Sequence, residues 1–489
     1  RSTAIGRGAL ATQNFSTSTN AYNVGVGYDA GVSLTTGVEN TLIGSLAGDA
    51  LTDADFNIAI GWGALGADTK GNKTVAIGVG TLDAQNFTTS TDAFNTAVGH
   101  GAGGAVTTGK FNTFLGAVSG AVFTTGEKNV AVGTYALDKD TLGNKSVAVG
   151  YQSLTNQVFS TSTDTNNTAV GFNSGASIST GNANTIIGSL AGDALTDADD
   201  NVVLGVAALS SDTKGSHTTA LGKNALFYQN FTTATDTNNT AVGYHAGISV
   251  TTGIQNTFVG AEAGDGTDDG QANVAVGYLA LTSNCDNANT AVGRYALTNC
   301  TGAHNTAIGD QSGNNITSGS NNFFVGKDSG ITGSPGGNQT TGSNRGFLGD
   351  EQITSINAQV DISAASDERD KTDFTALDLG INFVKALKPY TFKWDKRSNY
   401  IDKSDPSVDL NKVTTNGTHK EDQLDIGFKA QDVLALEEAS NYKISDKTNL
   451  TVDISDDGKQ YSMRYARLVP ILVKAIQELE ARVATLEGE

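Results

Sequence analysis

The sequence predicts a mostly β, elongated fold: a parallel β-solenoid (β-roll), followed by a small α+β domain that ends in a coiled-coil helix. Two observations predict the solenoid. A short motif that closes on glycine recurs about every 17 residues along most of the chain, and turn-forming Thr-Thr-Gly segments separate many of the copies. An abrupt change of composition at Ser366, where glycine becomes scarce and lysine common, predicts the second domain.

The repeat has the form Asn-Thr-Ala-Val-Gly, as at Asn95–Gly99 and Asn239–Gly243. Up to Gly243 the closing glycines are spaced 21, 17, 17 and 17 residues apart in turn, which gives a superperiod of 72 residues. The four additional residues fall in polar stretches such as 85–92, so we expect a loop insertion on every fourth coil. Seventeen residues are too few for a propeller blade or a helical hairpin repeat, but they suit one coil of a parallel β-solenoid.

Both faces of the repeating strand are apolar. The residue before the motif glycine is Ile, Val or Leu, and the residue before that is usually Ala. Adjacent strand residues point to opposite faces, and a solenoid has one interior. We therefore expect the alanine face to pack against identical chains around a common axis, because exposed phenylalanines along it would aggregate. The alternative is that this face is small and exposed. Once per superperiod the alanine is replaced by a large residue: Leu42, Phe114, Ile186 and Phe258.

Composition and charge argue against several classes of function. The formal net charge is −20, and such an acidic chain is repelled by phosphate backbones, so we expect no nucleic-acid partner. No apolar run is long enough to span a membrane, so we expect no membrane insertion. The five histidines show no ligand spacing. The acidic turns around Asp193 and Asp265 lack the pattern of a calcium loop, and we expect no metal and no cofactor.

Cys285 and Cys300 occupy equivalent turns of consecutive coils. Stacking of the coils could bring their Cα atoms within disulfide range. In a reducing cytoplasm we expect free thiols instead.

The chain divides into a repetitive solenoid at 1–331, a turn-rich transition at 332–365 that contains the first proline, and a C-terminal domain at 366–489. Within the transition, 353–362 is a candidate for one more strand. Because the chain begins at Arg1 inside a repeat, we expect it to be a fragment or a processed product.

The C-terminal domain shows helical periodicity at 378–387, alternation typical of a strand at 390–394, and a strand or turn that enters a helix at 426–433. Its last segment carries apolar residues at a and d positions of a heptad, and β-branched residues at a with Leu at d would by themselves favour a dimer. The heptad is too short to settle the number of strands. The a and d residues are Val469, Leu472, Ile476, Leu479, Val483 and Leu486.

Two family resemblances extend these predictions. The Asn-Thr-Ala-Val-Gly repeats resemble the head domains of trimeric autotransporter adhesins, which implies a left-handed β-roll. The C-terminal segments resemble the intramolecular chaperone domain of phage tailspikes and fibres, the peptidase S74 family. That resemblance implies a homotrimeric tail fibre of the virion, present in the host cytoplasm before assembly. Its partners would be other virion tail proteins and a host cell-surface receptor, glycan or protein. The segments are 366–371, 387–390, 426–433 and 465–486.

The same resemblance implies self-cleavage between Ala365 and Ser366, with Ser366 as nucleophile and Lys371 as general base. This chemistry needs an uncharged lysine, hence partial desolvation, which would tie cleavage to assembly. The alternative is that Ser366 and Asp367 cap a helix and Lys371 is a solvated charge. At most we expect autoproteolysis, and no enzyme activity in the solenoid.

Two other functions compete with the tail fibre. A bacterial trimeric surface adhesin would need a signal peptide and a C-terminal membrane anchor, and the sequence shows neither pattern. A glycan-degrading tailspike would need a pair of carboxylates across a sugar-binding cleft, and the uniform repeats mark no such pair.

Overall fold

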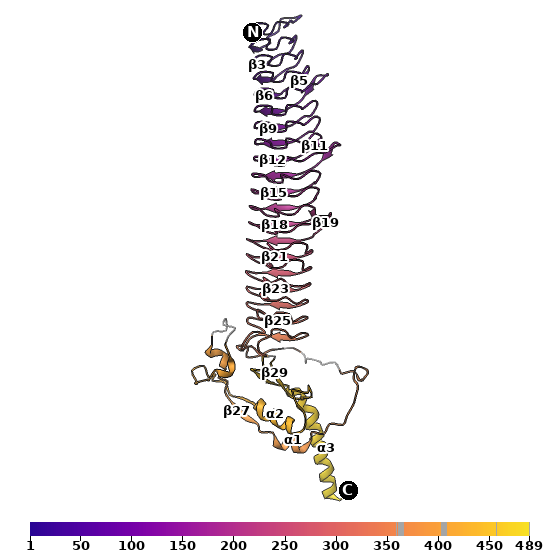
Figure 1. Cartoon of the computed structure of the whole chain (residues 1–489), viewed down its shortest axis with the longest axis vertical. Coiled ribbons are helices and arrows are strands. Elements are labelled where there is room, and N and C mark those ends of the chain that lie inside the picture. The colour runs from indigo at the N-terminus through magenta and orange to yellow at the C-terminus, as the bar shows by residue number, and fades with distance from the viewer. Residues whose placement is uncertain (358, 360–365, 402–407, 456, 489) are drawn as a thin grey trace. The chain divides into compact units, whose positions relative to one another are not determined.

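A computed structural model describes residues 1–357, 359, 366–401, 408–455 and 457–488 (Figure 1). The chain forms two compact units, residues 1–289 and 290–489, which we describe in turn. Within the described ranges, no helix has both the length and the apolar character needed to cross a membrane.

The first unit is a parallel β-solenoid, as the repeat predicted. Each coil contributes a three-residue strand that pairs in parallel with the strand of the next coil (Figure 1). The motifs align residue by residue, so that Ala97 pairs with Phe114 and Val98 with Leu115. The strands of this sheet are β1 (Thr3–Ile5), β2 (Val24–Val26), β3 (Thr41–Ile43), β4 (Ile58–Ile60), β6 (Val75–Ile77), β8 (Thr96–Val98), β9 (Thr113–Leu115), β10 (Val130–Val132), β12 (Val147–Val149), β14 (Thr168–Val170), β15 (Thr185–Ile187), β16 (Val202–Leu204), β18 (Thr219–Leu221), β20 (Thr240–Val242), β21 (Thr257–Val259) and β22 (Val274–Val276).

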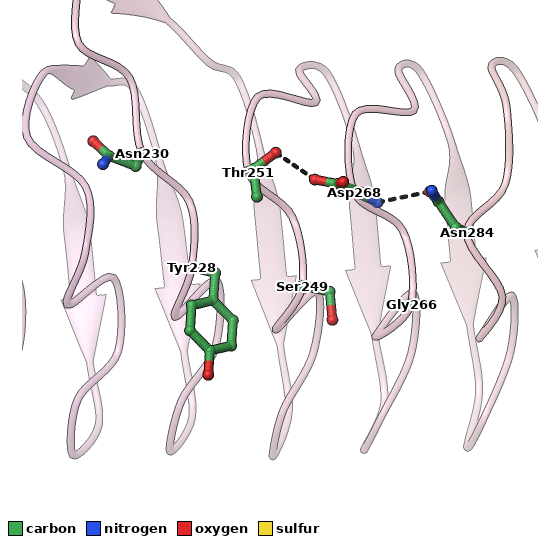
Figure 2. A pocket seen from close by; sticks show the side chains of 7 residues that line it. All are labelled: Tyr228, Asn230, Ser249, Thr251, Gly266, Asp268 and Asn284. Carbon is green, nitrogen blue, oxygen red and sulfur yellow. Dashed lines mark hydrogen bonds between the residues drawn. The ribbon is translucent and has the colours of Figure 1, made fainter.

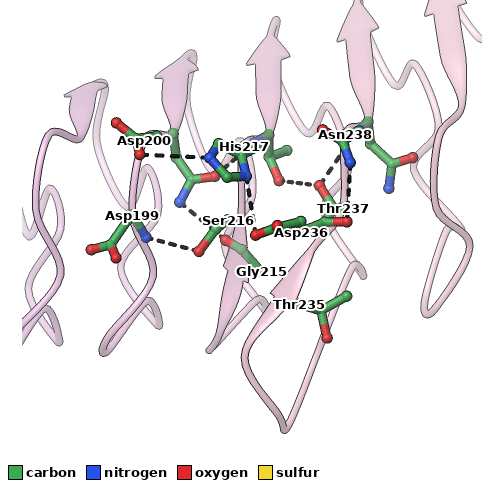
Figure 3. Close-up of polar contacts among 12 residues, drawn as sticks. Asp199, Asp200, Gly215, Ser216, His217, Thr235, Asp236, Thr237 and Asn238 are labelled. Carbon is green, nitrogen blue, oxygen red and sulfur yellow. Dashed lines mark hydrogen bonds and ion pairs between the residues drawn. The ribbon is translucent and has the colours of Figure 1, made fainter.

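Of the four insertions expected on every fourth coil, the three that follow Gly78, Gly150 and Gly222 each add a two-residue strand that pairs in parallel with the preceding coil. Salt bridges tie the inserted loops to the solenoid, with Lys73 bound to Asp92 at 2.6 Å in the first. In the third, His217 takes the place of the lysine and lies 3.1 Å from Asp236 and 3.6 Å from Asp200 (Figure 3). The paired strands are β5 (Gly71–Asn72) with β7 (Thr91–Asp92), β11 (Gly143–Asn144) with β13 (Thr163–Asp164), and β17 (Gly215–Ser216) with β19 (Thr235–Asp236).

The alanine face of the strand is the interior of the solenoid. Phe114 and Phe258 are 0% exposed in the single chain, and Leu42 and Ile186 are equally buried. The prediction that this face packs against other chains is therefore wrong, and so is the alternative that it is exposed. The Ile, Val and Leu residues before the motif glycine point outward instead, with Leu115 exposed.

The interior is narrow, which explains why alanine dominates it. A large strand residue fits only where the turns beside it carry glycine. A Cβ added to Gly120 would lie 2.2 Å from the Phe114 ring, and one added to Gly103 would lie 2.8 Å from it. Where neither a coil's own strand residue nor that of the next coil is large, as on the coil of Ala131, a buried leucine such as Leu137 takes the glycine position. Volume is thus conserved from coil to coil, as dense packing requires.

A ladder of buried asparagines joins successive coils. The Asn40 backbone N–H donates to Asn23 Oδ1 at 2.8 Å, and the Asn57 N–H donates to Asn40 Oδ1 at 2.9 Å. On most coils the amide nitrogen donates across the coil, as Asn23 Nδ2 does to the carbonyl of Gly37 at 2.8 Å. A side chain such as that of Asn23 thus satisfies buried backbone groups on two coils. This role explains the asparagine that opens the motif.

On every fourth coil the ladder residue is replaced, and a buried network fills the gap. Beside the insertion that follows Gly78, Thr74 takes the asparagine position, and Gln85 donates to Thr74 at 3.1 Å and to Asp68 at 2.7 Å. The Asp68 carboxylate also accepts from the backbone N–H groups of Gly71 and Phe87. Burial raises the pKa of Asp68, and the hydrogen bonds oppose that rise. The sequence analysis did not identify this network.

The second unit contains four further parallel strands and the C-terminal α+β domain. Leu379, Phe383, Val433, Val452, Leu468 and Ile471 form the domain's core. The described part of the candidate strand 353–362, residues 353–357 and 359, is irregular, so that prediction is wrong there; its other residues lie outside the description. The parallel strands are β23 (Thr290–Val292), β24 (Thr306–Ile308), β25 (Phe323–Val325) and β26 (Gly346–Leu348), and the domain holds α1 (Ile381–Ala386), α2 (Ala430–Ala439), α3 (Leu468–Glu487), and the antiparallel pairs β27 (Tyr390–Phe392) with β28 (Asp425–Gly427) and β29 (Val452–Ile454) with β30 (Tyr461–Met463).

Both cysteines are buried and lie outside any disulfide of the described structure. Burial raises the pKa of the Cys285 thiol to about 11, so it stays protonated near neutral pH and is a poor nucleophile.

Candidate functional site

Ser366 and Lys371, the predicted nucleophile and base, are in contact. Lys371 Nζ lies 2.6 Å from Ser366 Oγ and 3.0 Å from the Ser366 carbonyl oxygen. A single turn of 3₁₀ helix, Glu368–Asp370, brings the two side chains together. This is the distance at which a base could remove a hydroxyl proton. Ala365, on the other side of the predicted cleavage point, lies outside the described residues.

The pair is more exposed to solvent than a lysine that acts as a general base. Ser366 and Lys371 are both exposed in the single chain. A lysine acts as a general base only when uncharged, and removal from water is what favours the uncharged amine. The pair therefore has the geometry for proton transfer but lacks the desolvation.

The alternative explanation of the motif also has structural support. Asp367 caps the 3₁₀ turn, because its Oδ1 accepts from the backbone N–H of Arg369 at 2.9 Å. The Arg369 guanidinium binds the same carboxylate at 2.6 Å, and these bonds hold the pKa of Asp367 below its usual value. Capping uses Asp367 rather than Ser366, which leaves the serine hydroxyl to Lys371.

Two glutamates that the sequence analysis missed position the helices of this domain. Glu478 of α3 accepts from the backbone N–H of Ile381 at 2.7 Å and so caps the start of α1. Glu437 of α2 is fully buried and accepts from the backbone N–H groups of Thr451, at 2.6 Å, and Leu450, at 3.1 Å. A charged residue within an otherwise apolar stripe was the available signal for Glu437.

The heptad predicted at the C-terminus is a helix, α3, with two different apolar faces. Leu468, Ile471 and Ala475 are buried against the domain. The a and d residues lie on the other face and are uncovered, from 42% exposed at Leu472 to 86% at Leu486. We call this second face the α3 seam; it consists of Val469, Leu472, Ile476, Leu479, Val483 and Leu486.

The first unit also presents an apolar surface. Its outer sheet face carries Val, Ile, Leu and Thr on successive coils, for example Val202 and Leu204 on β16 and Thr185 and Ile187 on β15. Parallel pairing in register stacks these side chains into rows. Uncovered apolar rows of this kind mark an interaction surface.

No group of three or more His, Cys, Asp and Glu side chains that could hold a metal ion occurs among the residues described. The acidic turns around Asp193 and Asp265 therefore form no such group.

A parallel β-solenoid joined to a small α+β domain with an uncovered helical seam defines a fibrous protein with a C-terminal assembly domain. Residues 366–440 match the model of the peptidase S74 family, described as the chaperone of endosialidase. Solenoid and chaperone together fit a tail fibre or tailspike with a C-terminal intramolecular chaperone domain. No curated protein matches the chain.

Proposed function

We propose that the chain is a homotrimeric phage tail fibre protein for attachment to the host surface. The C-terminal domain would align three chains during folding in the host cytoplasm. The product would then join other tail proteins in the virion. The observation that carries this proposal is the uncovered α3 seam, because six exposed apolar residues at heptad spacing need partner helices. The match to the chaperone family supports it.

The repeats themselves explain the need for such a domain. Identical coils leave most contacts intact when one chain slips by one coil against another, so register is weakly specified along the solenoid. A domain that trimerises at one end sets the register before the repeats associate. In the trimer, the outer rows of Val, Ile, Leu and Thr would face the sister chains.

The Ser366–Lys371 pair would cleave the chain before Ser366 after assembly. In the trimer a neighbouring chain would cover the pair and remove water from Lys371. The serine hydroxyl would give its proton to the lysine amine and attack the Ala365 carbonyl carbon. The peptide C–N bond would then break, the amine of Ser366 would take up a proton, and water would hydrolyse the resulting ester. The geometry in support is the 2.6 Å contact between Lys371 Nζ and Ser366 Oγ.

Two measurements on one set of samples test this function. Analytical ultracentrifugation of the expressed chain should give the mass of a trimer, or of a trimer of the cleaved product. Denaturing electrophoresis should show a fragment of residues 366–489 in the wild type and none in Ser366→Ala or Lys371→Ala. A monomeric wild type would contradict the fibre, and an uncut trimeric wild type would contradict only the cleavage.

A further inference from the structure

One groove on the first unit interrupts the regular repeat. On the coil that follows Gly222, the sixth residue after the motif glycine is Tyr228. On all the remaining coils of this unit that residue is Ala, Ser, Thr, Val, Asn, Lys or Gly. The equivalent residues in the two preceding superperiods are Asn156 and Ala84. A tyrosine here adds nothing to the solenoid core, because its side chain is 54% exposed.

Tyr228 borders a groove of about 620 Å³ (Figure 2). The groove is shallow and open to solvent, and its volume lies within the range of small-molecule sites, roughly 300–1,000 Å³. The other side chains that line it are polar, and Gly266 lacks a side chain at the position that Tyr228 occupies two coils earlier. The polar lining residues are Asn230, Ser249, Thr251, Asp268 and Asn284.

The aromatic ring is held in place. Phe227 meets the Tyr228 ring edge to face, with centroids 4.7 Å apart and planes at 89°. The Tyr228 backbone N–H donates to the carbonyl of Ile248 at 3.1 Å. A fixed, exposed aromatic ring offers a flat apolar surface at little cost in entropy.

The polar groups are also ordered. Thr251 donates to the Asp268 carboxylate, and the Asp268 backbone N–H donates to Asn284 Oδ1 at 3.0 Å (Figure 2). Asn230 Oδ1 accepts from Thr213 at 3.2 Å, which sets the orientation of that amide. Hydroxyls and amides can both donate and accept hydrogen bonds, which matches ligands that carry many hydroxyl groups.

Charge narrows the class of ligand. Among the described residues that line the groove there is no lysine, arginine or histidine, whereas Asp268 is one of them, and Asp265 precedes Gly266. Asp265 Oδ1 is buried and accepts no hydrogen bond among the described atoms. Carboxylates without a cation repel anionic sugars and can accept hydrogen bonds from sugar hydroxyls.

We propose that this groove binds a neutral oligosaccharide, with one sugar ring stacked on Tyr228 and its hydroxyl groups bonded to Asn230, Ser249, Thr251 and Asp268. The inference rests on the proposed host attachment and names the receptor chemistry for it. The groove residues belong to the connecting segments between strands, and none belongs to the sheet whose outer rows would face sister chains.

Isothermal titration calorimetry on the full chain tests this site with four neutral hexamers, namely maltohexaose, cellohexaose, mannohexaose and N-acetylchitohexaose, and with the anionic hyaluronan hexamer. At least one neutral hexamer should bind, and hyaluronan should not. Tyr228→Ala should weaken binding at least tenfold, since stacking on an aromatic ring is lost, whereas Tyr228→Phe should stay within about threefold. Tyr28→Ala, which removes a ring of similar exposure elsewhere on the solenoid (46% against 54%), should leave the affinity unchanged.

The site would be overturned if none of the four neutral hexamers bound. Binding that Tyr228→Ala leaves intact, or a preference for hyaluronan, would overturn it as well. Ultracentrifugation of the same samples separates this failure from that of the proposed function. A trimer that binds no hexamer contradicts the groove alone, and a monomeric wild type contradicts the fibre itself.

Discussion

The solenoid and the C-terminal domain reach stability by opposite means. Each solenoid coil is narrow, fills its interior with alanine, glycine and one large residue, and satisfies its buried backbone through the asparagine ladder of the next coil. The C-terminal domain has one small apolar core and leaves the α3 seam uncovered. The solenoid therefore extends by repetition without specifying where to stop, whereas the domain ends in an apolar seam, the surface through which the proposed trimer would be selected.

Disrupting the α3 seam should have the largest effect on assembly. Ile476→Glu places a charge in the middle of the seam, and its burial between helices without a partner would be strongly unfavourable. We expect ultracentrifugation to show loss of the trimer, with little soluble trimer remaining. Gln477→Glu introduces the same charge at the next position, where the side chain is exposed outside the seam, and should leave the trimer intact. If both variants formed trimers, or if neither did, the result would contradict a specific role of the α3 seam in assembly.

Within the solenoid, the motif glycines should be the most sensitive positions. Gly188 has φ +142°, and a Cβ added there would lie 2.3 Å from the carbonyl oxygen of Gly205 on the next coil. We expect Gly188→Ala to cost about 3 kcal/mol or more, since strain and a backbone clash combine. Gly101 has φ +63° with open space around its Cβ position, so Gly101→Ala should cost only about 1 kcal/mol. Hydrogen exchange measured for each coil gives the free-energy cost of both substitutions. Similar costs would show that the close contact with the next coil is not what requires glycine at position 188.

Loss of one ladder asparagine should have an intermediate effect. Asn184→Ala removes the acceptor for the Asn201 backbone N–H, at 3.1 Å, and the donor to the carbonyl of Ala198, at 2.8 Å. Leaving buried polar groups unpaired should cost about 2–3 kcal/mol, seen as faster amide exchange on the coils beside it. Asn182, which is half-buried and donates within its own turn, provides the control variant Asn182→Ala. Unchanged exchange in Asn184→Ala would mean that the ladder contributes little.

The smallest expected effect is a pH dependence near the groove. Burial, with a contribution from Glu262, raises the pKa of Asp265 to about 6. The folded state therefore holds this proton more tightly than the unfolded chain, where the pKa is near 3.9. The resulting stability is present below about pH 4 and is lost as the pH rises through about 6. Amide exchange around Gly266, corrected for intrinsic rates, should show local opening become easier over that window. Asp265→Asn should remove the dependence, and its persistence would assign it to another group.

The positions of the repeats, their insertions and the α3 heptad could be predicted because each is a periodicity of residue types. The interior side of the strand could not be predicted, because alternation distinguishes two faces without saying which one the connecting turns enclose. That choice depends on residues such as Gly103 and Gly120, which make room for Phe114 from two different coils. The buried Asp68–Gln85 network was likewise hidden, since its members are separated in sequence.

By itself, the sequence determined a 17-residue coil, a 72-residue superperiod and a C-terminal helix with a heptad seam, because local pattern is enough to specify such elements. Only the tertiary structure decided that alanine lines the interior, that the aliphatic row faces outward, and that Ser366 and Lys371 meet on an exposed turn. These outcomes depend on how much space neighbouring coils and turns leave, a property of the packed chain rather than of any one segment.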